Sequence, residues 1–329
     1  MGMRILVTGA TGCVGANVVE ALLERGHEVR AMQRSTSRLD ALDGLAPEMV
    51  VGDVLDLDSL RAAMTGCDWV IHAAAISQYW RNGADLIYRV NVEGTRNALR
   101  AAQEAGVQRL VYTSSAAALG LPPTPGAVLD ETSTFNLPPE HFPYGHSKVL
   151  AEAAVQEAVR NGLDAVIVNP VPVIGQRDIG FVGGEFLRAA RQGKAVVAPP
   201  GGSGVVSARA VGRGHVLAAE RGRTGERYLL NGENLRFRDL MATVADVVGA
   251  RPPWFVIPRP AMRLFAAAVG VANRVHNGPP LIDEVQARLS AHKIYFDGGK
   301  AKRELGFPHV PARAAVEEAW TWYRNHDML

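Results

Sequence analysis

The feature that most constrains this chain is a glycine-rich turn between a short apolar strand and an amphipathic helix. A strand is predicted at residues 4–8, and the turn TGATGCVG at 8–15 places glycines at positions 9, 12 and 15. The first glycine permits the turn, the second lets backbone N–H groups approach a pyrophosphate, and the third lets helix pack on strand. The N-terminus of such a helix favours anions. The alternative is a plain strand-to-helix turn that binds nothing.

Short apolar runs alternate with longer amphipathic segments through the first half of the chain. Because parallel strands need a crossover connection, this alternation predicts an α/β fold, a Rossmann-type doubly wound parallel sheet. The rhythm ends after Asn169, where prolines and the run PPGGSG at 199–204 interrupt it. The strands of this sheet are predicted at residues 4–8, 28–32, 49–51, 69–73, 109–113 and 165–169.

A smaller C-terminal substrate-binding lobe is predicted beyond that break. We assign residues 1–170 to the Rossmann domain, and residues 171–204 and 232–329 mainly to the lobe. Segments near 205–231 and 293–297 are expected to return to the Rossmann domain. Within these parts we predict short strands at 228–231 and 294–296, and a strand followed by a helix within 250–275.

Composition excludes several classes of protein. The 329 residues suffice for a core without metal or disulfide support, and we predict no metal site. With 35 basic and 33 acidic side chains and no basic run, a nucleic-acid partner is not expected. Cys13 and Cys67 are predicted to be buried thiols rather than a disulfide. The first apolar run continues into the glycine turn, so we expect no signal peptide. The apolar stretch 261–275 contains arginines, so we expect no membrane span. A cytoplasmic protein is therefore expected.

The end of the second predicted strand bears on the choice of cofactor. An NAD site usually has Asp or Glu there, whereas this chain has Gln33 and Arg34, followed by Arg38. Arginine can pair with a 2′-phosphate that a carboxylate would repel, so NADP(H) is favoured over NAD(H), with a solvated Arg34 as the alternative. Asp53 could reach the adenine amine or merely cap a turn. Small residues at 71–75 leave room for a ribose or simply pack the core.

A tyrosine and a lysine four residues apart suggest acid-base chemistry. Tyr144 and Lys148 lie on a helix predicted to begin near Pro143, and this spacing places them on one face. A nearby ammonium would lower the phenol's pKa from about 10 and make Tyr144 a proton donor to a carbonyl or an acceptor from an alcohol. Ser115, after the strand at 109–113, would fix the substrate oxygen.

Three further polar residues accompany this pair. Asn91 lies inside a predicted helix, where it would relay a proton through water to Lys148 or else belong to an exposed polar face. His146 is two positions from Tyr144 and should point elsewhere, and His72 is expected to pack at a strand end. Both histidines are predicted to be structural.

These motifs together resemble the extended (atypical) short-chain dehydrogenase/reductase family over essentially the whole chain. The residues are TGxxGxxG at 8–15, GDxxD at 52–56, the strand before Ser115 and YxxxK at 144–148. The segments VNVEGTRNALRAA, VYTSSAAALG, ERYLLNGENL and FDGGKAKRELGF resemble its dihydroflavonol-reductase-like branch, in the NAD-dependent epimerase/dehydratase family. The resemblance implies a triad of Ser115, Tyr144 and Lys148 with Asn91 in support, and residues 169–171 beside the nicotinamide.

The candidate site residues form two overlapping sets, besides the catalytic Ser115, Tyr144, Lys148 and Asn91. The substrate set is expected between the lobes. The cofactor set is Gly9, Thr11, Gly12, Cys13, Val14, Gly15, Gln33, Arg34, Arg38, Asp53, Val54, Ala73, Ala74, Ala75, Asn91, Thr113, Tyr144, Lys148, Pro170, Val171 and Val173. The substrate set is Ile76, Tyr79, Trp80, Ser115, Ala116, Asn169, Val173, Phe181 and Phe186.

Departures from the family pattern narrow the expected reaction. Ala116 and Ala117 stand where sugar-nucleotide dehydratases carry Asp-Glu, so water elimination is not expected. The segment Ser207–Gly212 departs from the HVDDVA pattern of related proteins. Nucleotide-sugar epimerases tend to carry an arginine near this stretch that clamps the substrate diphosphate, and Arg209 and Arg213 lie at different positions along the segment. These departures leave substrate binding or lobe packing there open.

We therefore predict an NADP-dependent carbonyl reductase or alcohol dehydrogenase that acts on a ketone, aldehyde or secondary alcohol. Tyr79 and Trp80 suggest a rather apolar or aromatic substrate, or else they pack the interface between the lobes. The alternatives are a nucleotide-sugar 4-epimerase with tightly bound NAD and a non-catalytic dinucleotide-sensing protein. Helices predicted at 85–105 and 144–161 could pair in a homodimer, with a monomer left open.

Overall fold

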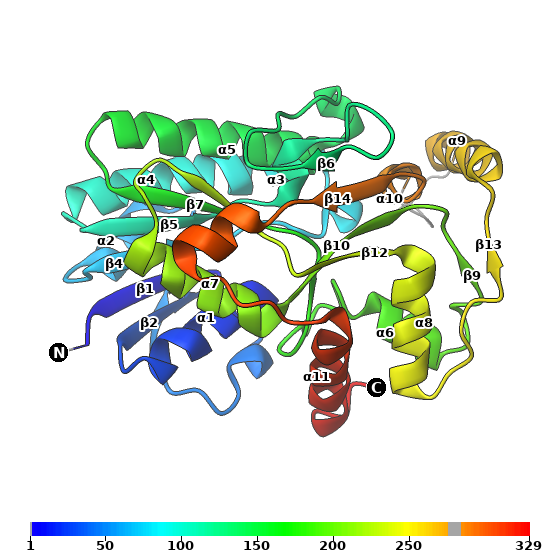
Figure 1. Ribbon diagram of the computed structural model, residues 1–329. Coiled ribbons are helices and arrows are strands. Elements are labelled where there is room, and N and C mark those ends of the chain that lie inside the picture. Colours follow the sequence, from blue (N-terminus) through cyan, green and yellow to red (C-terminus); the bar gives the residue numbers. More distant parts are fainter. Residues whose placement is uncertain (1, 276–283) are drawn as a thin grey trace.

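A seven-stranded parallel sheet forms the centre of the computed structural model, which describes residues 2–275 and 284–329 (Figure 1). Its strand order is β11-β7-β5-β4-β1-β2-β3. From β1 the chain adds β2 and β3 on one side and then crosses over to add β4 and the later strands on the other, as in a doubly wound sheet. The predicted α/β Rossmann-type fold is confirmed. The strands are β1 (Arg4–Thr8), β2 (Glu28–Gln33), β3 (Glu48–Val51), β4 (Trp69–His72), β5 (Arg109–Thr113), β7 (Ala165–Pro170) and β11 (Arg227–Leu230).

Helices cover both faces of this sheet, because successive strand residues point to opposite sides. In β1, Ile5 and Val7 join one core and Leu6 joins the other, and all three are fully buried. The first core lies under α1 (Cys13–Glu24) and α7 (Ala208–Arg221), and the second lies under α2 (Leu57–Met64), α4 (Gly94–Glu104) and α5 (Pro143–Arg160).

A second sheet is built mostly from the later part of the chain. Its order is β12-β10-β14-β6, with β8 paired to β10, and a separate two-stranded sheet joins β13 and β9. The strands are β6 (Val128–Leu129), β8 (Val173–Ile174), β9 (Val197–Ala198), β10 (Gly202–Ser207), β12 (Glu233–Arg236), β13 (Phe255–Val256) and β14 (Lys293–Phe296).

The strand predicted at 228–231 joins the main sheet as β11, but the one predicted at 294–296 does not. It is β14, which pairs with β10 and β6 in the second sheet, so its expected return to the main sheet is wrong. The Phe296 carbonyl oxygen accepts hydrogen bonds from Asn231 Nδ2 at 2.7 Å and Asn234 Nδ2 at 2.9 Å. These bonds hold β14 against the chain that leaves β11.

The remaining helices lie around and beyond the second sheet. A third core joins α6 (Glu185–Arg191), α8 (Phe237–Val248) and α11 (Ala312–Asn325), while α9 (Arg259–Val275) and α10 (Glu284–Leu289) lie at one end of the molecule (Figure 1). The strand and helix predicted within 250–275 are β13 and α9. Shorter helical segments are Asp40–Leu42, Tyr79–Arg81, α3 (Ala84–Tyr88), Arg89–Glu93, Ala116–Leu119, Pro139–His141 and Ala301–Leu305.

Two expectations drawn from composition can be compared with this fold. Cys67 is a buried free thiol, as predicted. Cys13 is also free, and although the residue as a whole is half-buried, its Sγ donates to the Gln176 carbonyl at 3.6 Å and burial raises the pKa of its thiol. Among the helices of the described chain, none is long and apolar enough to cross a membrane.

The unusual segment at 207–212 serves the packing of α7 on α1. Ser207 caps α7 by accepting a hydrogen bond at 3.3 Å from the Ala210 N–H. Gly212 faces α1 so closely that a Cβ there would lie 2.2 Å from the Asn17 carbonyl oxygen. The close approach of the two helices therefore explains Gly212, and capping of α7 explains Ser207.

We expect Gly212→Ala to lower the free energy of unfolding by about 1–3 kcal/mol, because its methyl group overpacks the contact between α1 and α7. Urea denaturation measures this. Gly83→Ala is the matched control, since a Cβ at Gly83 meets nothing within 4 Å. Equal destabilisation by the two substitutions would contradict the packing role of Gly212.

Candidate active site

Glycine is present at the three positions of the first turn for different physical reasons. Gly9 has φ +67°, and a Cβ there would lie 2.6 Å from Ala74 N, while a Cβ at Gly15 would lie 2.1 Å from Gly9 O. At exposed Gly12 the nearest atom, Gly9 O, would be 3.5 Å from a Cβ. Packing within the protein therefore explains Gly9 and Gly15, whereas Gly12 leaves the backbone open to a ligand.

The start of α1 fits the pyrophosphate of a dinucleotide. Gly12 provides no side-chain cap, and the first turn of α1 carries no acidic residue. The N–H groups of this turn therefore present their positive end toward solvent, as anion binding requires. Beside the turn, Thr8 Oγ1 accepts a hydrogen bond at 3.3 Å from Ala74 N, which holds the end of β4 next to β1.

The residues predicted to hold the adenosine half lie at the ends of β2 and β3. Arg34 is exposed, and its guanidinium makes no ion pair with any residue that the structure describes. Arg38 instead pairs with Asp40, at 3.1 Å and 3.2 Å. Asp53 Oδ1 accepts from Leu55 N at 2.9 Å, which is the turn role named as its alternative. Arg34 is thus the freer of the two cations.

Tyr144 lies in the first turn of α5, within a cluster of aromatic rings. Its ring stacks on Tyr79, with centroids 5.4 Å apart, and lies 6.0 Å from that of Phe142. Burial raises the pKa of Tyr144, and a hydrogen bond with Ser115 opposes that rise. The structure therefore brings Tyr144, Ser115 and Tyr79 together at the carboxyl end of β5, where ligands of doubly wound sheets bind.

Lys148 is one turn further along α5 and is fully buried. Its Nζ donates to the Thr113 carbonyl at 2.8 Å and lies 3.4 Å from the Tyr112 hydroxyl. Burial lowers the pKa of Lys148 to about 7, and the charge of Glu152 opposes this. The expectation that Lys148 lowers the Tyr144 pKa is wrong in this structure, because burial dominates both groups and the ammonium is bound to Thr113.

Asn91 occupies a wide helical turn, Arg89–Glu93, between α3 and α4. Its Oδ1 accepts from Ile76 N at 2.8 Å, and its Nδ2 donates to Ile76 O at 3.2 Å and to Ser147 Oγ at 3.0 Å. The side chain is thus neither on an exposed face nor bonded to Lys148. It fixes the chain after β4 against α5, and wide helical turns of this kind are frequent at functional sites.

Glu152 is a residue of this site that the sequence analysis missed. It is buried on α5, accepts a hydrogen bond from Asn169 Nδ2 at 2.6 Å and another from Ser114 Oγ, and pairs with Arg227 at 3.2 Å. The signal was present in the sequence, because 144, 148 and 152 are spaced by four and share one helix face. Glu152 is the buried counter-charge nearest to Lys148 along that face.

Asn169 supports Ser115 from the neighbouring strand. Its Nδ2 also donates to the Ser115 carbonyl at 3.1 Å. Its Oδ1 is buried and has no hydrogen-bond partner within the part of the chain that the structure describes. An unpartnered buried oxygen is costly, so its place beside Ser115 fits an acceptor for a ligand donor.

Some of the other predicted site residues lie beside Tyr144, and others lie in the third core. Trp80 packs edge-on against Tyr79 with centroids 5.1 Å apart, next to the Tyr144 cluster. Phe181 and Phe186 instead stack on Tyr323 and Phe237 at the third core. Both histidines are structural, as predicted: His72 lies between Thr8 and Thr95, burial lowers its pKa to about 3, and His146 bonds the Tyr88 hydroxyl.

The backbone positions predicted to line the cofactor follow the strand ends. Thr113 directs its side chain away, to His215 Nε2 at 2.8 Å, and offers its carbonyl to Lys148. Pro170 ends β7, Val171 is buried and Val173 begins β8. Val54 is buried against α4, where its carbonyl accepts from Asn97.

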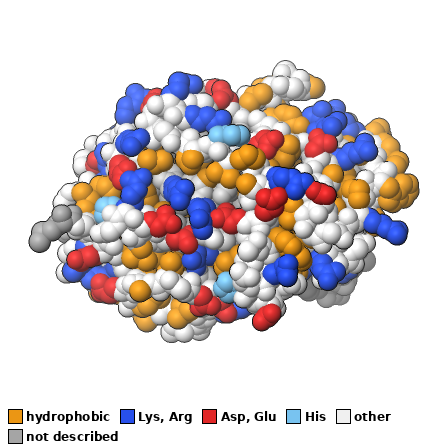
Figure 2. Space-filling view, turned by 60° about the horizontal axis from the view of Figure 1, so that its bottom comes forward, with side chains coloured by type: hydrophobic (Ala, Val, Ile, Leu, Met, Phe, Trp, Pro, Cys, Tyr) orange, Lys and Arg blue, Asp and Glu red, His pale blue; other side chains and the backbone are white. Residues whose placement is uncertain are grey.

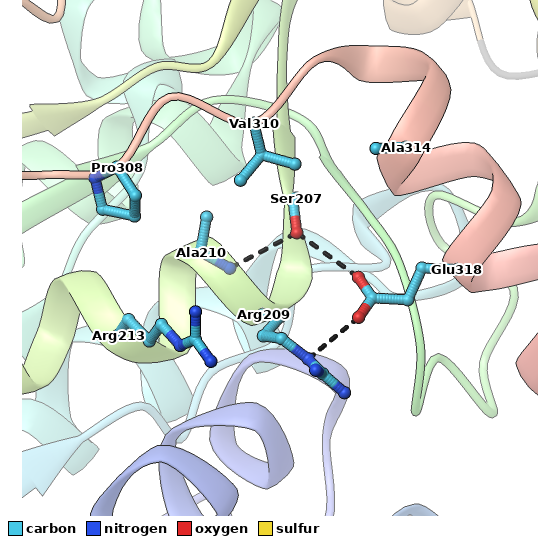
Figure 3. A pocket seen from close by; sticks show the side chains of 8 residues that line it. All are labelled: Ser207, Arg209, Ala210, Arg213, Pro308, Val310, Ala314 and Glu318. Carbon is cyan, nitrogen blue, oxygen red and sulfur yellow. Dashed lines mark hydrogen bonds and ion pairs between the residues drawn. The ribbon is translucent and has the colours of Figure 1, made fainter.

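A separate pocket of about 200 Å³ lies between the start of α7 and α11 (Figure 3). Arg209 reaches across it and pairs with Glu318 at 2.9 Å, while Arg213 pairs with Glu24 at 3.5 Å. Both arginines are therefore already engaged by carboxylates. This geometry gives no support to either of them as a clamp for a diphosphate.

The fold and this site define a class of NAD(P)-dependent enzymes that includes reductases, dehydrogenases and epimerases. The chain belongs to the NAD-dependent epimerase/dehydratase family, an extended short-chain dehydrogenase/reductase family, whose model matches residues 5–230. It is an oxidoreductase-type enzyme of this family acting on small molecules.

Two relatives span nearly the whole chain. A Synechocystis protein provisionally named dihydroflavonol 4-reductase is 38% identical and covers 97% of this chain and 94% of its own. Sterol demethylase protein B of Methylococcus capsulatus is 36% identical and covers 99% and 100%. Other relatives are named as a ketoreductase, a cinnamoyl-CoA reductase and a 3β-hydroxysteroid dehydrogenase.

Solved structures agree with this assignment. The crystal structure of gox2253 is 36% identical with a TM-score of 0.88, and covers 100% of both chains. A nucleoside-diphosphate-sugar epimerase from Pseudomonas aeruginosa, PA4631, is 29% identical with a TM-score of 0.82 and covers 100% of both.

The buried lysine makes a stability prediction. Burial lowers the Lys148 pKa from 10.5 to about 7, so between these values the unfolded chain binds more protons than the folded one. The lysine therefore destabilises the fold most below pH 7, and this penalty shrinks as the pH rises toward 10.5. We expect Lys148→Met to raise the free energy of unfolding by roughly 1–3 kcal/mol at about pH 6 and by less at about pH 10.

Denaturant titrations at the two pH values measure the effect. Lys194→Met, at an exposed lysine, is the control and should change stability little at either pH. A gain for Lys148→Met that is the same at both pH values would contradict the assigned pKa.

Proposed function

We propose that the chain is an NADP(H)-dependent carbonyl reductase or alcohol dehydrogenase. The observation that carries the proposal is the hydrogen bond between the Ser115 and Tyr144 side chains, with the Tyr144 ring packed against the rings of Tyr79 and Phe142. No carboxylate follows Ser115, where Ala116 and Ala117 stand. The site thus offers one proton donor and one oxygen anchor, which is what the interconversion of a carbonyl and an alcohol needs.

The hydroxyl groups have distinct roles in this proposal. Ser115 Oγ accepts a hydrogen bond at 3.1 Å from Ala117 N, which orients it. Its hydroxyl is hydrogen-bonded to Tyr144 in this structure, and a substrate oxygen placed between the two would accept from both. A tyrosine phenol carries its proton at neutral pH, so Tyr144 can donate it to that oxygen. Burial raises the pKa of Tyr144, and the hydrogen bond with Ser115 opposes that rise. A bound nicotinamide would supply the hydride for the carbonyl carbon.

The buried groups behind the hydroxyls position them. Lys148, held by the Thr113 carbonyl, and Glu152, held by Asn169 and Arg227, tie α5 to β5 and β7. A rigid support of this kind keeps the donor within reach of the substrate oxygen. It leaves few degrees of freedom for Tyr144.

The walls of the site support a large apolar substrate. Tyr79, Trp80, Phe142 and Tyr144 form one connected set of rings beside the two hydroxyls. The names of several relatives refer to flavonoid, sterol and steroid chemistry, in which the reacting oxygen is attached to an apolar ring system. We propose a ketone or secondary alcohol on such a ring system as substrate.

A nucleotide-sugar 4-epimerase is the second candidate, favoured by the likeness to the Pseudomonas aeruginosa epimerase. Such an enzyme would retain NAD through its cycle and consume none. The engagement of Arg209 and Arg213 by carboxylates speaks against a diphosphate clamp at the start of α7. Tightly bound NAD together with conversion of a UDP-sugar would establish this alternative.

We expect Tyr144→Phe to lower the turnover of NADPH-dependent reduction about 100-fold or more, because the proton donor is lost while the ring packing stays. The assay follows NADPH oxidation with aldehydes, α-substituted ketones and oxidised hydroxysteroids. Tyr88→Phe is the control, since its hydroxyl bonds His146 instead. Full turnover in Tyr144→Phe would show that another group donates the proton.

Cofactor preference is tested separately at the end of β2. We expect Arg34→Ser to weaken NADPH binding roughly 10- to 100-fold and to leave NADH binding nearly unchanged, since only NADPH carries the 2′-phosphate. Arg38→Ser should have a smaller effect, because Arg38 already pairs with Asp40. Equal losses for NADPH and NADH after Arg34→Ser would refute the preference.

A further inference from the structure

An apolar surface covers the end of the molecule formed by β9, β13 and α9, where Figure 1 places these elements at the right. Figure 2 shows hydrophobic side chains gathered at the same end. Trp254 is 77% exposed and Leu264 73% exposed, which is unusual for large apolar side chains. We define this end surface by Val196, Val197, Trp254, Phe255, Leu264 and Phe265, all exposed.

The end surface is carried on regular backbone. Trp254 N donates to Val196 O at 3.2 Å, and Ile257 N donates to Ala198 O at 2.9 Å. These bonds hold the residues just before and just after β13 against the chain at β9. The rings of Trp254 and Phe255 lie 5.7 Å apart. These aromatic side chains are thus displayed by a paired strand.

Helix α9 has two apolar faces with different surroundings. Met262 and Ala266 are buried against Ala287 and Ala291, beside α10. Leu264 and Phe265 lie on the outer side, and Leu264 in particular is largely in water. The inner face accounts for the packing of α9, so the exposed apolar residues have no role in the fold that the structure shows.

Charge identifies what the end surface fits. The sequence contains no Asp or Glu between Asp246 and Asp283, whereas it contains arginines at 251, 259, 263 and 274. Arg251 and Arg259 are exposed. The chain as a whole is nearly balanced at +2, so this combination of aromatic, aliphatic and purely basic side chains is local.

We propose that the end surface docks on an anionic lipid membrane. Exposed Trp, Phe and Leu side chains enter the boundary between headgroups and acyl chains, and nearby arginines pair with lipid phosphates. A second copy of the chain fits less well, because a twofold contact would bring the basic segments together, and residues 247–282 contain no Asp or Glu to pair with their arginines. The inference goes beyond the proposed function and does not depend on it.

Vesicle co-sedimentation with the full-length chain tests the proposal. We expect binding to vesicles of phosphatidylcholine mixed with phosphatidylglycerol, much weaker binding to phosphatidylcholine alone, and loss of binding at high salt. The double variant Trp254→Ser/Leu264→Ser should bind at least about 10-fold more weakly. The control Leu86→Ser/Val128→Ser, at exposed apolar residues elsewhere, should bind like the parent chain.

A second double variant tests the contribution of charge separately from that of apolar insertion, and its melting curve shows whether it folds. Arg251→Glu/Arg259→Glu should lower affinity for the anionic vesicles roughly 10-fold or more and leave the thermal melting curve nearly unchanged. Absence of binding by the parent chain, or undiminished binding by the Trp254→Ser/Leu264→Ser variant, would overturn the proposal. So would a parent dimer that this variant dissociates in sedimentation velocity, since that result assigns the surface to a second copy.

Discussion

The close approach of backbone at the first glycine turn is the constraint on which the nucleotide end of the molecule depends. Gly9 lies against the backbone of Ala74 at the end of β4, and Gly15 lies against the Gly9 carbonyl, with no room for a Cβ at either position. This contact sets where α1 begins and which way its free N–H groups point. It also joins the ends of β1 and β4, so the proposed anion site and the carboxyl ends of these central strands form one unit.

The end of the sheet that carries the proposed catalytic residues depends on burial instead. Lys148 and Glu152 are buried on one face of α5, and the carbonyl of Thr113, the amide of Asn169 and the guanidinium of Arg227 compensate them. Removing a charge from water is costly unless such partners exist, so this arrangement spends stability to hold one geometry. The same burial raises the pKa of Tyr144, and its hydrogen bond with Ser115 opposes that rise.

Periodicity and glycine spacing predicted the main sheet because both are local properties. The strand ends differed by one residue or so, and Tyr144 and Lys148 share a face of α5 because residues four apart always do on a helix. The destination of β14 was not predictable in this way. A four-residue strand can pair wherever an edge is offered, and the side-chain amides of Asn231 and Asn234 direct it to the second sheet.

The sequence by itself determined the Rossmann-type sheet, the open turn at Gly12 and the set of polar residues at the strand ends, since each follows from residue type and spacing. Only the tertiary structure decided what those residues contact. Asn91 bonds Ile76, Arg38 bonds Asp40 and Lys148 bonds Thr113. Hydrogen bonds and pKa values depend on distance and burial, and these are set by how segments far apart in the chain pack together.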